Sequence, residues 1–358
     1  MRVLKKSIYN ITRKTILNVG LILIVLFFNS CGSTIEDNCP NISYSDLKIT
    51  VVQEPKIIAG SSKLSMILKV DENFNKHLPV SGLTTGNFKV YEKGPNDDCP
   101  NPISESEANK QFSPSPQKFR HNTLIVLDLS ASVTSSTLSQ LKSSTTSFIN
   151  NIITSNGDES YLVGISWFDG EDKLNTLVDF TSDKNKLINA VQNINAGITN
   201  DPSTDLYGAV IKSVDKAEQR LKDLQQESYI SAFSIVIFTD GTDQAARYSK
   251  QTALNKVAGA NAKISLFTIG LGTEIDKTVL TSIGKNGAVF PQNKNELEAK
   301  FVELARIVRG EANSYYLFEY CSPKRAGKVQ LVLVVQYDAK KGTYATNFDA
   351  TGLTSNCY

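Results

Sequence analysis

The chain has 358 residues, of which 38 are Lys or Arg and 36 are Asp or Glu. A chain of this length exceeds the usual single domain, so it has room for more than one hydrophobic core. The nearly balanced charge argues against a nucleic-acid partner, because binding to nucleic acid depends on an excess of positive charge.

The first 30 residues have the pattern of an export signal. Five basic residues precede the apolar run 16–28, which is too short to span a membrane comfortably. The sequence FNSCGS follows and resembles a bacterial lipoprotein signal, which implies cleavage before Cys31 and lipidation of that cysteine. An ordinary secretory signal or a short membrane anchor is the alternative. Removal of residues 1–30 lowers Lys plus Arg from 38 to 33 against 36 acidic residues, a net charge of about −3.

The next part of the chain is predicted to be a polar tether followed by a β segment. The tether covers residues 31–46, and the β segment covers residues 47–118. Within this segment the apolar and β-branched runs predict strands at residues 47–53, 63–70 and 87–92. Residues 95–117 are rich in Pro, Ser, Asn and Asp, which predicts a long loop or linker.

Residues 119–311 are predicted to form a doubly wound α/β domain. Short runs rich in Ile and Val are typical of strands buried on both faces of a mostly parallel sheet. They cover residues 123–127, 161–167, 234–238 and 264–269. Apolar residues at helical spacing in 138–152 and 206–221 predict helices between the strands. An edge strand is expected at 174–180, and Asp183 is placed to begin a helix at 186–194. Alternation of this kind gives a doubly wound fold.

Five oxygen-bearing residues stand where apolar runs end. Asp128, Ser130 and Ser132 lie in LIVLDLSAS, Thr204 lies in PSTDLYGAV, and Asp240 lies in SIVIFTDGTD. The carboxyl ends of parallel strands meet at one edge of an α/β sheet, so these side chains are expected to converge. Three hydroxyls and two carboxylates form a hard oxygen ligand set for a divalent cation such as Mg²⁺, with Mn²⁺ or Ca²⁺ also suitable. A helix N-cap is the alternative for DxSxS alone.

The order DxSxS, a single Thr before a helix and TDG after a buried strand resembles the metal-ion-dependent adhesion site of von Willebrand factor A domains. The resemblance implies that Ser130, Ser132 and Thr204 touch the metal directly. It implies that Asp128 and Asp240 supply charge and act through bound water. A Glu or Asp carboxylate of a partner would then complete the metal's ligand shell.

Two features of the site depart from the family pattern or leave it open. Thr204 is preceded by Asp201-Pro202-Ser203, where many relatives have glycine. The sequence therefore does not decide the shape of this turn at the edge of the metal site. Asp243 follows TDG and is expected to be a solvated turn carboxylate. The alternative is that it contacts the metal ligands without touching the metal itself.

An enzyme is not expected. A serine nucleophile needs a base, and the chain has only His77 and His121. His121 is expected on the surface, at the end of the first strand opposite the metal site. No GxSxG elbow, HExxH motif or P-loop is present.

The cysteines fit an oxidising compartment. Lipidation of Cys31 would leave Cys39, Cys99, Cys321 and Cys357, an even set that allows three connectivities. The spacing does not suggest zinc. The tail phrases YCSPKRAGK and NFDATGLTSNC resemble a pattern of related bacterial envelope proteins in which the two cysteines occur together. This resemblance favours Cys321–Cys357 and leaves Cys39–Cys99.

The C-terminal segment 312–358 returns to a β pattern. After a helix at 297–308, strands are predicted at residues 315–320, 329–337 and 344–348. Three strands alone are a marginal core. In addition, SGLTTGNFKVYEKG in the first β segment resembles a phrase found ahead of bacterial von Willebrand A domains. We therefore expect the two β segments to pack as one immunoglobulin-like sandwich, with the α/β domain inserted between them.

Two functions follow from these predictions. The first is a lipid-anchored protein of the bacterial envelope, on the outer membrane or cell surface, that binds a protein or peptide carboxylate through the metal site. A periplasm-facing orientation stays open. The second is a structural or assembly subunit of an envelope complex, with a fixed partner or a vestigial site. The complete set of five residues favours the first, and a hydrolase is a distant third.

Overall fold

The computed structural model describes residues 39–358 except 59, 74–77, 113–118, 227–229 and 355–358. The predicted signal peptide, Cys31 and the first half of the polar tether (31–38) therefore lie outside the described residues. Among the helices that the structure describes, none combines the length and apolar character needed to cross a bilayer.

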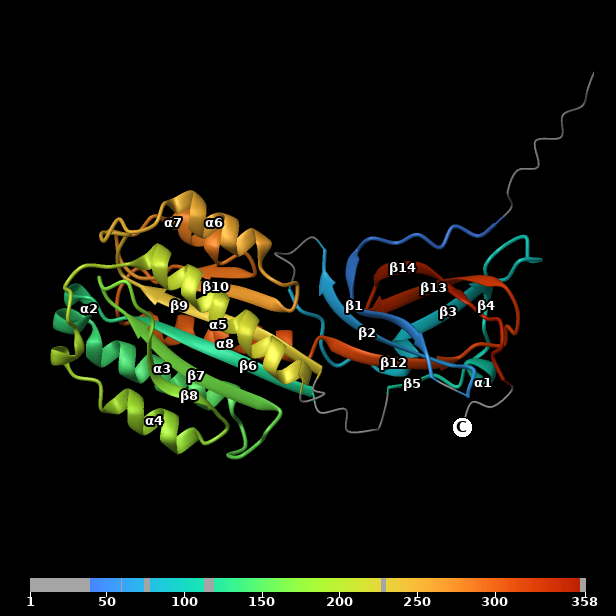
Figure 1. Ribbon diagram of the computed structural model, residues 1–358, viewed down its shortest axis with the longest axis horizontal. Coiled ribbons are helices and arrows are strands. Elements are labelled where there is room, and N and C mark those ends of the chain that lie inside the picture. Colours follow the sequence, from blue (N-terminus) through green and yellow to red (C-terminus); the bar gives the residue numbers. More distant parts are fainter. Residues whose placement is uncertain (1–38, 59, 74–77, 113–118, 227–229, 355–358) are drawn as a thin grey trace, which may run out of the picture. The chain divides into compact units, whose positions relative to one another are not determined.

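The α/β region contains a six-stranded sheet in the order β11-β10-β9-β6-β7-β8 (Figure 1). All neighbours in this sheet pair in parallel except β8, which runs antiparallel to β7 at one edge. The predicted mostly parallel sheet is confirmed, as is the edge strand. The strands are β6 (Phe119–Asp128), β7 (Tyr161–Phe168), β8 (Asn175–Thr181), β9 (Ile230–Thr239), β10 (Ile264–Gly270) and β11 (Gly287–Val289).

Helices pack on both faces of this sheet (Figure 1). One face is covered by α3 (Leu138–Ile152), α4 (Lys184–Gln192) and α8 (Leu297–Ala312). The other face is covered by α5 (Leu206–Gln226), α6 (Lys250–Gly259) and α7 (Lys277–Ile283). The short α2 (Ala131–Ser136) and η2 (Ala196–Ile198) lie in the connections. Asp183 caps α4 as predicted, because its side chain accepts the Lys186 N–H.

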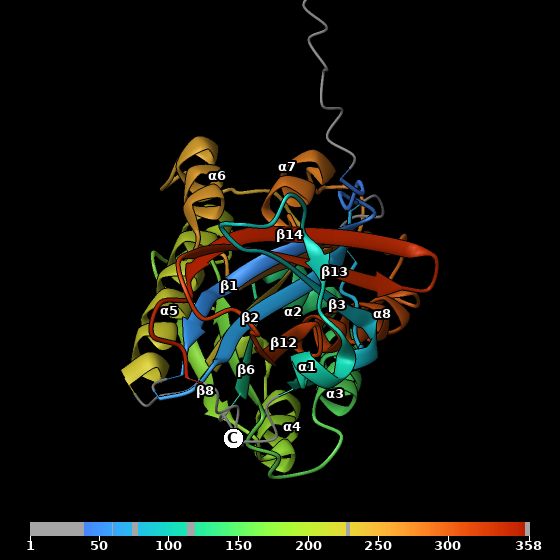
Figure 2. The same ribbon diagram turned by 90° about the vertical axis from the view of Figure 1, so that its right-hand side faces the viewer.

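The segments before and after the α/β region form two four-stranded sheets, which face the viewer in Figure 2. One sheet has the order β1-β2-β12-β5 and the other β14-β13-β3-β4. Strands from both segments pair in each sheet, since β2 pairs with β12 and β3 with β13. Both sheets contribute to one core, in which the Phe88 and Phe318 rings stack with centroids 4.9 Å apart. The strands are β1 (Leu47–Ile57), β2 (Lys63–Glu72), β3 (Phe88–Lys93), β4 (Asn101–Pro102), β5 (Gln111–Phe112), β12 (Tyr315–Cys321), β13 (Lys328–Tyr337) and β14 (Lys340–Asp349).

The two β segments thus share a core, while the immunoglobulin-like assignment and the domain boundaries stay predictions. The predicted long loop at residues 95–117 was wrong in part. Besides β4 and β5 it contains the short helix α1 (Glu105–Ala108). Ser104 caps this helix by accepting the Glu107 N–H, and Asn109 ends it in the left-handed conformation at φ 37°. The same polar residues that suggested a loop therefore serve as helix caps. A further short helix, η1 (Thr85–Asn87), precedes β3.

A disulfide joins Cys39 and Cys99, which are 60 positions apart in the sequence. Cys321 is also disulfide-bonded, and Cys357 lies outside the described residues. We expect the double replacement Cys39→Ser, Cys99→Ser to lower the free energy of unfolding by about 4 kcal/mol, because the unfolded chain loses a long closed loop. Urea unfolding of the variant and the wild type measures this loss. Mass mapping of non-reduced peptides checks the pairing, and a peptide joining Cys99 to Cys321 would overturn it.

A buried ion pair connects β2 with the end of α8. Lys69 Nζ lies 2.6 Å from a Glu311 oxygen and 3.2 Å from an Asp71 oxygen. Burial alone lowers the pKa of Lys69, but the two carboxylates outweigh it, so that the pKa is raised overall. Burial raises the pKa of Glu311. The three side chains therefore form a charge cluster whose stability depends on the lysine.

Candidate metal-binding site

The carboxyl ends of β6 and β9 meet where the strand order reverses. From β6 the chain adds β7 and β8 on one side and later β9, β10 and β11 on the other. A crevice forms at such a switch point, outside the carboxyl ends of the strands, because the two neighbouring connections lead away in opposite directions. Asp128 is the last residue of β6 and Asp240 directly follows β9, so both carboxylates stand at this crevice.

Four of the five predicted residues are linked by hydrogen bonds. Asp128 Oδ1 accepts the Ser130 N–H at 2.9 Å. The Ser130 and Ser132 hydroxyl oxygens are 3.2 Å apart. The Ser132 hydroxyl donates to Asp240 Oδ1 at 2.7 Å, which joins the end of β6 to the end of β9. The structure therefore brings together residues that are more than a hundred positions apart.

The fifth residue, Thr204, is buried just before α5 and faces the turn that contains Asp240. Its carbonyl accepts the N–H groups of Gln244 and Ala245, at 2.9 and 3.1 Å. A Cβ atom placed on Gly241 would lie 4.0 Å from Thr204 Oγ1, so this hydroxyl is beside the same turn. Thr204 thus belongs with the other four residues, as the sequence predicts.

The two carboxylates sit in an environment that disfavours their charge. Burial raises the pKa of Asp128 to about 6, although hydrogen bonds from Thr239 and Ser130 oppose this rise. Burial also raises the pKa of Asp240, and the Ser132 hydroxyl opposes it. A divalent cation beside these groups would favour their ionised forms, since an opposite charge stabilises a carboxylate.

The chemistry of the donors fits a hard divalent cation. Across the described residues, no three His, Cys, Asp or Glu side chains come together as metal ligands, so the candidate site depends on hydroxyl oxygens. Mg²⁺ takes about six oxygen ligands and keeps several waters, which suits three hydroxyls and two carboxylates. Mn²⁺ and Ca²⁺ accept the same ligands.

The turn before Thr204 has a defined shape despite its lack of glycine. Asp201 Oδ1 accepts the N–H and the hydroxyl of Ser203, at 3.0 and 2.7 Å. Asp169 is fully buried, and its Oδ2 accepts the N–H groups of Asn200 and Asp201, at 2.9 and 3.1 Å. A Cβ atom on Gly170 would lie 2.2 Å from Asp201 Oδ1, so a larger residue at this position would displace the Asp201 side chain. A glycine on the opposing loop therefore leaves room for this turn.

Asp243 is half-exposed in the turn after Asp240, and both of its carboxylate oxygens accept backbone N–H groups. Its Oδ1 accepts the Tyr207 N–H at 3.0 Å, in the first turn of α5. Its Oδ2 accepts the Ala246 N–H at 3.1 Å. Asp243 therefore fixes the start of α5, and with it Thr204, against the loop after Asp240. The signal was a second Asp in TDGTD, but sequence spacing does not show which amides it reaches.

His121 was wrongly expected on the surface. It is 2 % exposed within β6, and its Nε2 lies 3.1 Å from the Ser234 hydroxyl on β9. Burial lowers the pKa of His121 to about 3, so the ring is neutral at pH 7. β6 begins earlier than predicted and runs between β7 and β9, which buries the histidine. It lies near the start of β6, whereas Asp128 ends the strand, so the predicted separation from the site is confirmed.

Thr239 also belongs to the site, although the sequence analysis did not select it. Its hydroxyl donates to Asp128 Oδ2 at 2.6 Å. We expect Thr239→Val to weaken metal binding about 10- to 100-fold, because a supporting hydrogen bond to a charge-bearing residue is lost. Thr123→Val is the matched control, since Thr123 is buried on β6 and its hydroxyl has no hydrogen-bond partner among the described residues. Calorimetric titration with Mn²⁺ compares the two variants, and equal affinities would contradict this role.

A family model described as von Willebrand factor type A domain matches residues 122–304. No curated protein gives a match. Among solved structures, the chain is similar to a von Willebrand factor type A protein from Catenulispora acidiphila, with 10 % identity and a TM-score of 0.44, covering 86 % of this chain and 74 % of that one.

Two further solved structures are similar over part of the chain. The von Willebrand factor domain of the type V pili tip protein Mfa5 from Porphyromonas gingivalis has 12 % identity and a TM-score of 0.41, covering 53 % of this chain and 95 % of that one. Manganese-loaded TRAP protein from Plasmodium vivax has 13 % identity and a TM-score of 0.41, covering 65 % and 94 %. The family model alone spans just over half of the present chain and includes all five predicted ligands. The chain therefore belongs to the von Willebrand factor type A domain family.

Proposed function

We propose that this protein is a lipid-anchored protein of the bacterial envelope that binds a protein or peptide partner through a divalent-metal-dependent adhesion site. The single observation that carries the proposal is the hydrogen-bonded chain from Asp128 through Ser130 and Ser132 to Asp240. It supplies hydroxyl and carboxylate oxygens at one crevice, with Thr204 beside them.

The charges of this site favour an acidic partner group. Ser130, Ser132 and Thr204 would be direct ligands, and they carry no charge. A bound divalent cation would act as an electrophile that accepts one more carboxylate oxygen. Asp240 accepts the Ser132 hydroxyl and Asp128 accepts the Ser130 N–H, so the two carboxylates hold the serine loop and would balance most of the cation's charge. Without the cation the same two carboxylates repel an acidic partner.

Binding is favoured over catalysis by the placement of His121, the histidine that lies within the described residues. His121 is buried toward the amino-terminal end of β6 and contacts Ser234, so it does not reach Ser130 or Ser132 as a base. Serine hydroxyls at the site are therefore proposed as ligands rather than nucleophiles.

Export and lipidation complete the proposal, and they rest on the sequence of residues 1–33. The envelope location, on the outer membrane or cell surface or facing the periplasm, follows from Cys31. A Cys31→Ala variant should lose acylation and signal cleavage. Normal processing and membrane fractionation of this variant would contradict the lipoprotein assignment.

The binding proposal is tested by affinity capture. The purified protein without its signal peptide is immobilised and incubated with solubilised envelope proteins, in Mg²⁺ or in chelator. The proposal expects one or a few proteins that are captured only with Mg²⁺ and only by wild type, not by Asp128→Ala. Equal capture in chelator would instead favour a fixed structural contact elsewhere on the chain.

A further inference from the structure

A groove extends from the candidate metal site along the loops after β10 and before α8. Its volume is about 410 Å³, at the small end of the range for ligand pockets. Ser132 and Asp240 are among its lining residues, so the groove borders two residues of the site. The other lining residues are Thr137, Leu271, Gly272, Thr273, Glu274, Gln292, Asn293 and Lys294.

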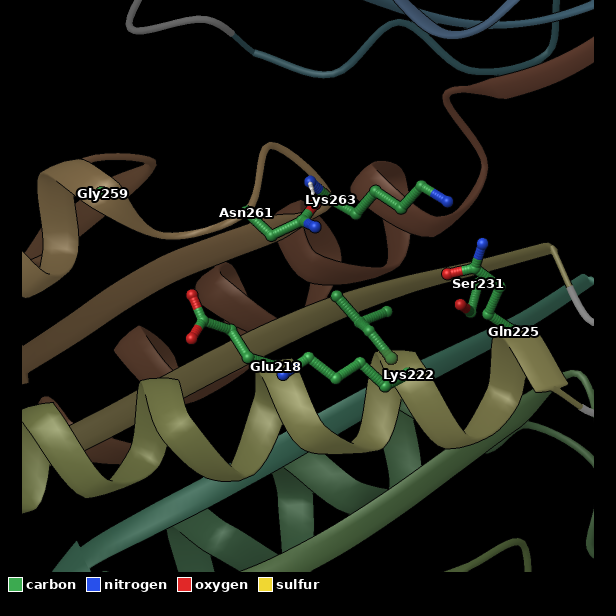
Figure 3. Close-up of a pocket in the computed structure, with 8 residues that line it drawn as sticks. Glu218, Lys222, Gln225, Ser231, Gly259, Asn261 and Lys263 are labelled. Carbon is green, nitrogen blue, oxygen red and sulfur yellow. Dashed lines mark hydrogen bonds between the residues drawn. The ribbon is translucent and has the colours of Figure 1, made fainter.

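The cavity in Figure 3 has no such connection. It is about 320 Å³ in volume and lies between α5, which carries Glu218 and Lys222, and the loop that carries Asn261 and Lys263. Asn261 and Lys263 precede β10, so this cavity lies toward the amino-terminal ends of the strands. The metal-site residues lie at the carboxyl ends. Of these two cavities in the described part of the chain, the first groove is the one that borders the metal-site residues.

The walls of the first groove are held in place by hydrogen bonds. The Leu271 N–H donates to the Thr239 carbonyl at 3.0 Å, which fixes the loop after β10 next to the site. On the other wall, Glu296 accepts the Gln292 N–H at 2.9 Å and the Asn293 side-chain amide at 3.0 Å. These contacts define the groove before any partner is present.

The two walls carry opposite charges, and among the described residues a hydrogen bond holds the positive one in place. Lys294 Nζ donates to the Ser136 carbonyl at 2.6 Å, which holds the ammonium group against the rim. Glu274 is exposed, and within the described part of the chain its carboxylate forms no ion pair. Glu274 and Asp240 line the same groove. A basic side chain that enters the groove could therefore form an ion pair with the Glu274 carboxylate.

Building on the proposed function, we infer that this groove binds the partner residues next to the metal-bound carboxylate and that Glu274 selects a basic side chain among them. The partner is then an exposed protein segment in which an Asp or Glu stands within about three residues of a Lys or Arg, a span of roughly 10 Å in extended chain. The acidic residue reaches the metal, and the basic residue pairs with Glu274. This charge pattern excludes a uniformly acidic segment.

The test uses immobilised short peptides in which one Glu is kept and one nearby position is Lys, Ala or Glu. Binding of the purified protein is measured in Mn²⁺ and in chelator. We expect metal-dependent binding in the order Lys above Ala above Glu, with about fivefold between Lys and Ala, as a partly exposed ion pair gives. Dense immobilisation of the peptides makes weak individual contacts measurable.

Charge reversal at Glu274 provides the decisive comparison. Glu274→Lys should invert the order, so that the peptide with a second Glu binds best, while Glu274→Gln should abolish the preference for Lys. Glu303→Lys is the matched control, because Glu303 is an exposed residue of α8 whose pair is the neighbouring Lys300. This variant should keep the wild-type order. Calorimetric titration with Mn²⁺ confirms that each variant still binds metal.

The outcomes separate the two proposals. Metal-dependent binding that ignores the second charge, or an unchanged order in Glu274→Lys, overturns the groove assignment and leaves the proposed function standing. Failure of wild type to bind any Glu peptide in a metal-dependent way counts against the proposed function, and the groove assignment falls with it.

Discussion

Replacing Asp128 with alanine should abolish metal-dependent partner binding. Asp128 accepts hydrogen bonds from Ser130 and Thr239 and is buried at the end of β6, so its loss removes both a charge and the anchor of the serine loop. We expect the affinity for Mg²⁺ or Mn²⁺ to fall about a hundredfold or more. Thr204→Ala should have a smaller effect, because one neutral ligand is lost. Metal titration and partner capture measure both.

The control for this prediction is Asp179→Ala, which removes an exposed carboxylate from the edge strand β8. It should bind metal and partner as the wild type does. Circular dichroism should show that all three variants are folded, since the cores on both faces of the sheet are untouched. Normal metal affinity in folded Asp128→Ala would remove Asp128 from the site.

Replacing Lys69 with methionine should cause a large loss of stability at neutral pH. Lys69 is paired with Glu311 and Asp71, and all three side chains are buried. The variant keeps two buried carboxylates without their cation, which costs about 3–5 kcal/mol. Urea unfolding at pH 7 measures the loss. Lys340→Met is the control, because the Lys340–Glu72 pair is partly exposed and contributes less than about 1 kcal/mol.

The loss in Lys69→Met should shrink as the pH falls. Burial already raises the pKa of Glu311 in the wild type, and removal of the lysine raises it further. A carboxyl group with a raised folded-state pKa destabilises the fold fully above that pKa. The cost disappears as the pH drops to the unfolded value of about 4.3, because the buried group is then neutral. A loss that stays constant from pH 7 to pH 5 would contradict this explanation.

The central strands were predictable because their side chains are apolar on both faces. The starts of β6 and β9 were not, since polar residues precede the apolar runs. His121 and Asn122 are buried in β6 ahead of the predicted run 123–127, and Ser231 is buried in β9 ahead of the predicted run 234–238. Their burial follows from pairing with strands far away in the sequence, and periodicity does not contain that information. For this reason His121, which was predicted to lie on the surface, is a core residue.

The five candidate ligands were predictable because each stands at the end of a strand or before a helix. The residues that hold the surrounding loops in place were not predictable. Asp169 orders the turn at residues 200–201, and Asp243 holds the start of α5, in both cases through backbone amides on another loop. Such contacts depend on how three loops converge after folding. Residue type and spacing point to the candidate ligands, whereas the loops that position them require the structure.

Calorimetric titration of the metal-stripped wild-type protein with Mg²⁺ and Mn²⁺ tests the central claim most directly. The account predicts saturable binding at one site, with both Asp128→Ala and Asp240→Ala showing no binding in the same range. The absence of any binding heat with Mg²⁺, Mn²⁺ and Ca²⁺, or unchanged binding in both variants, would contradict it.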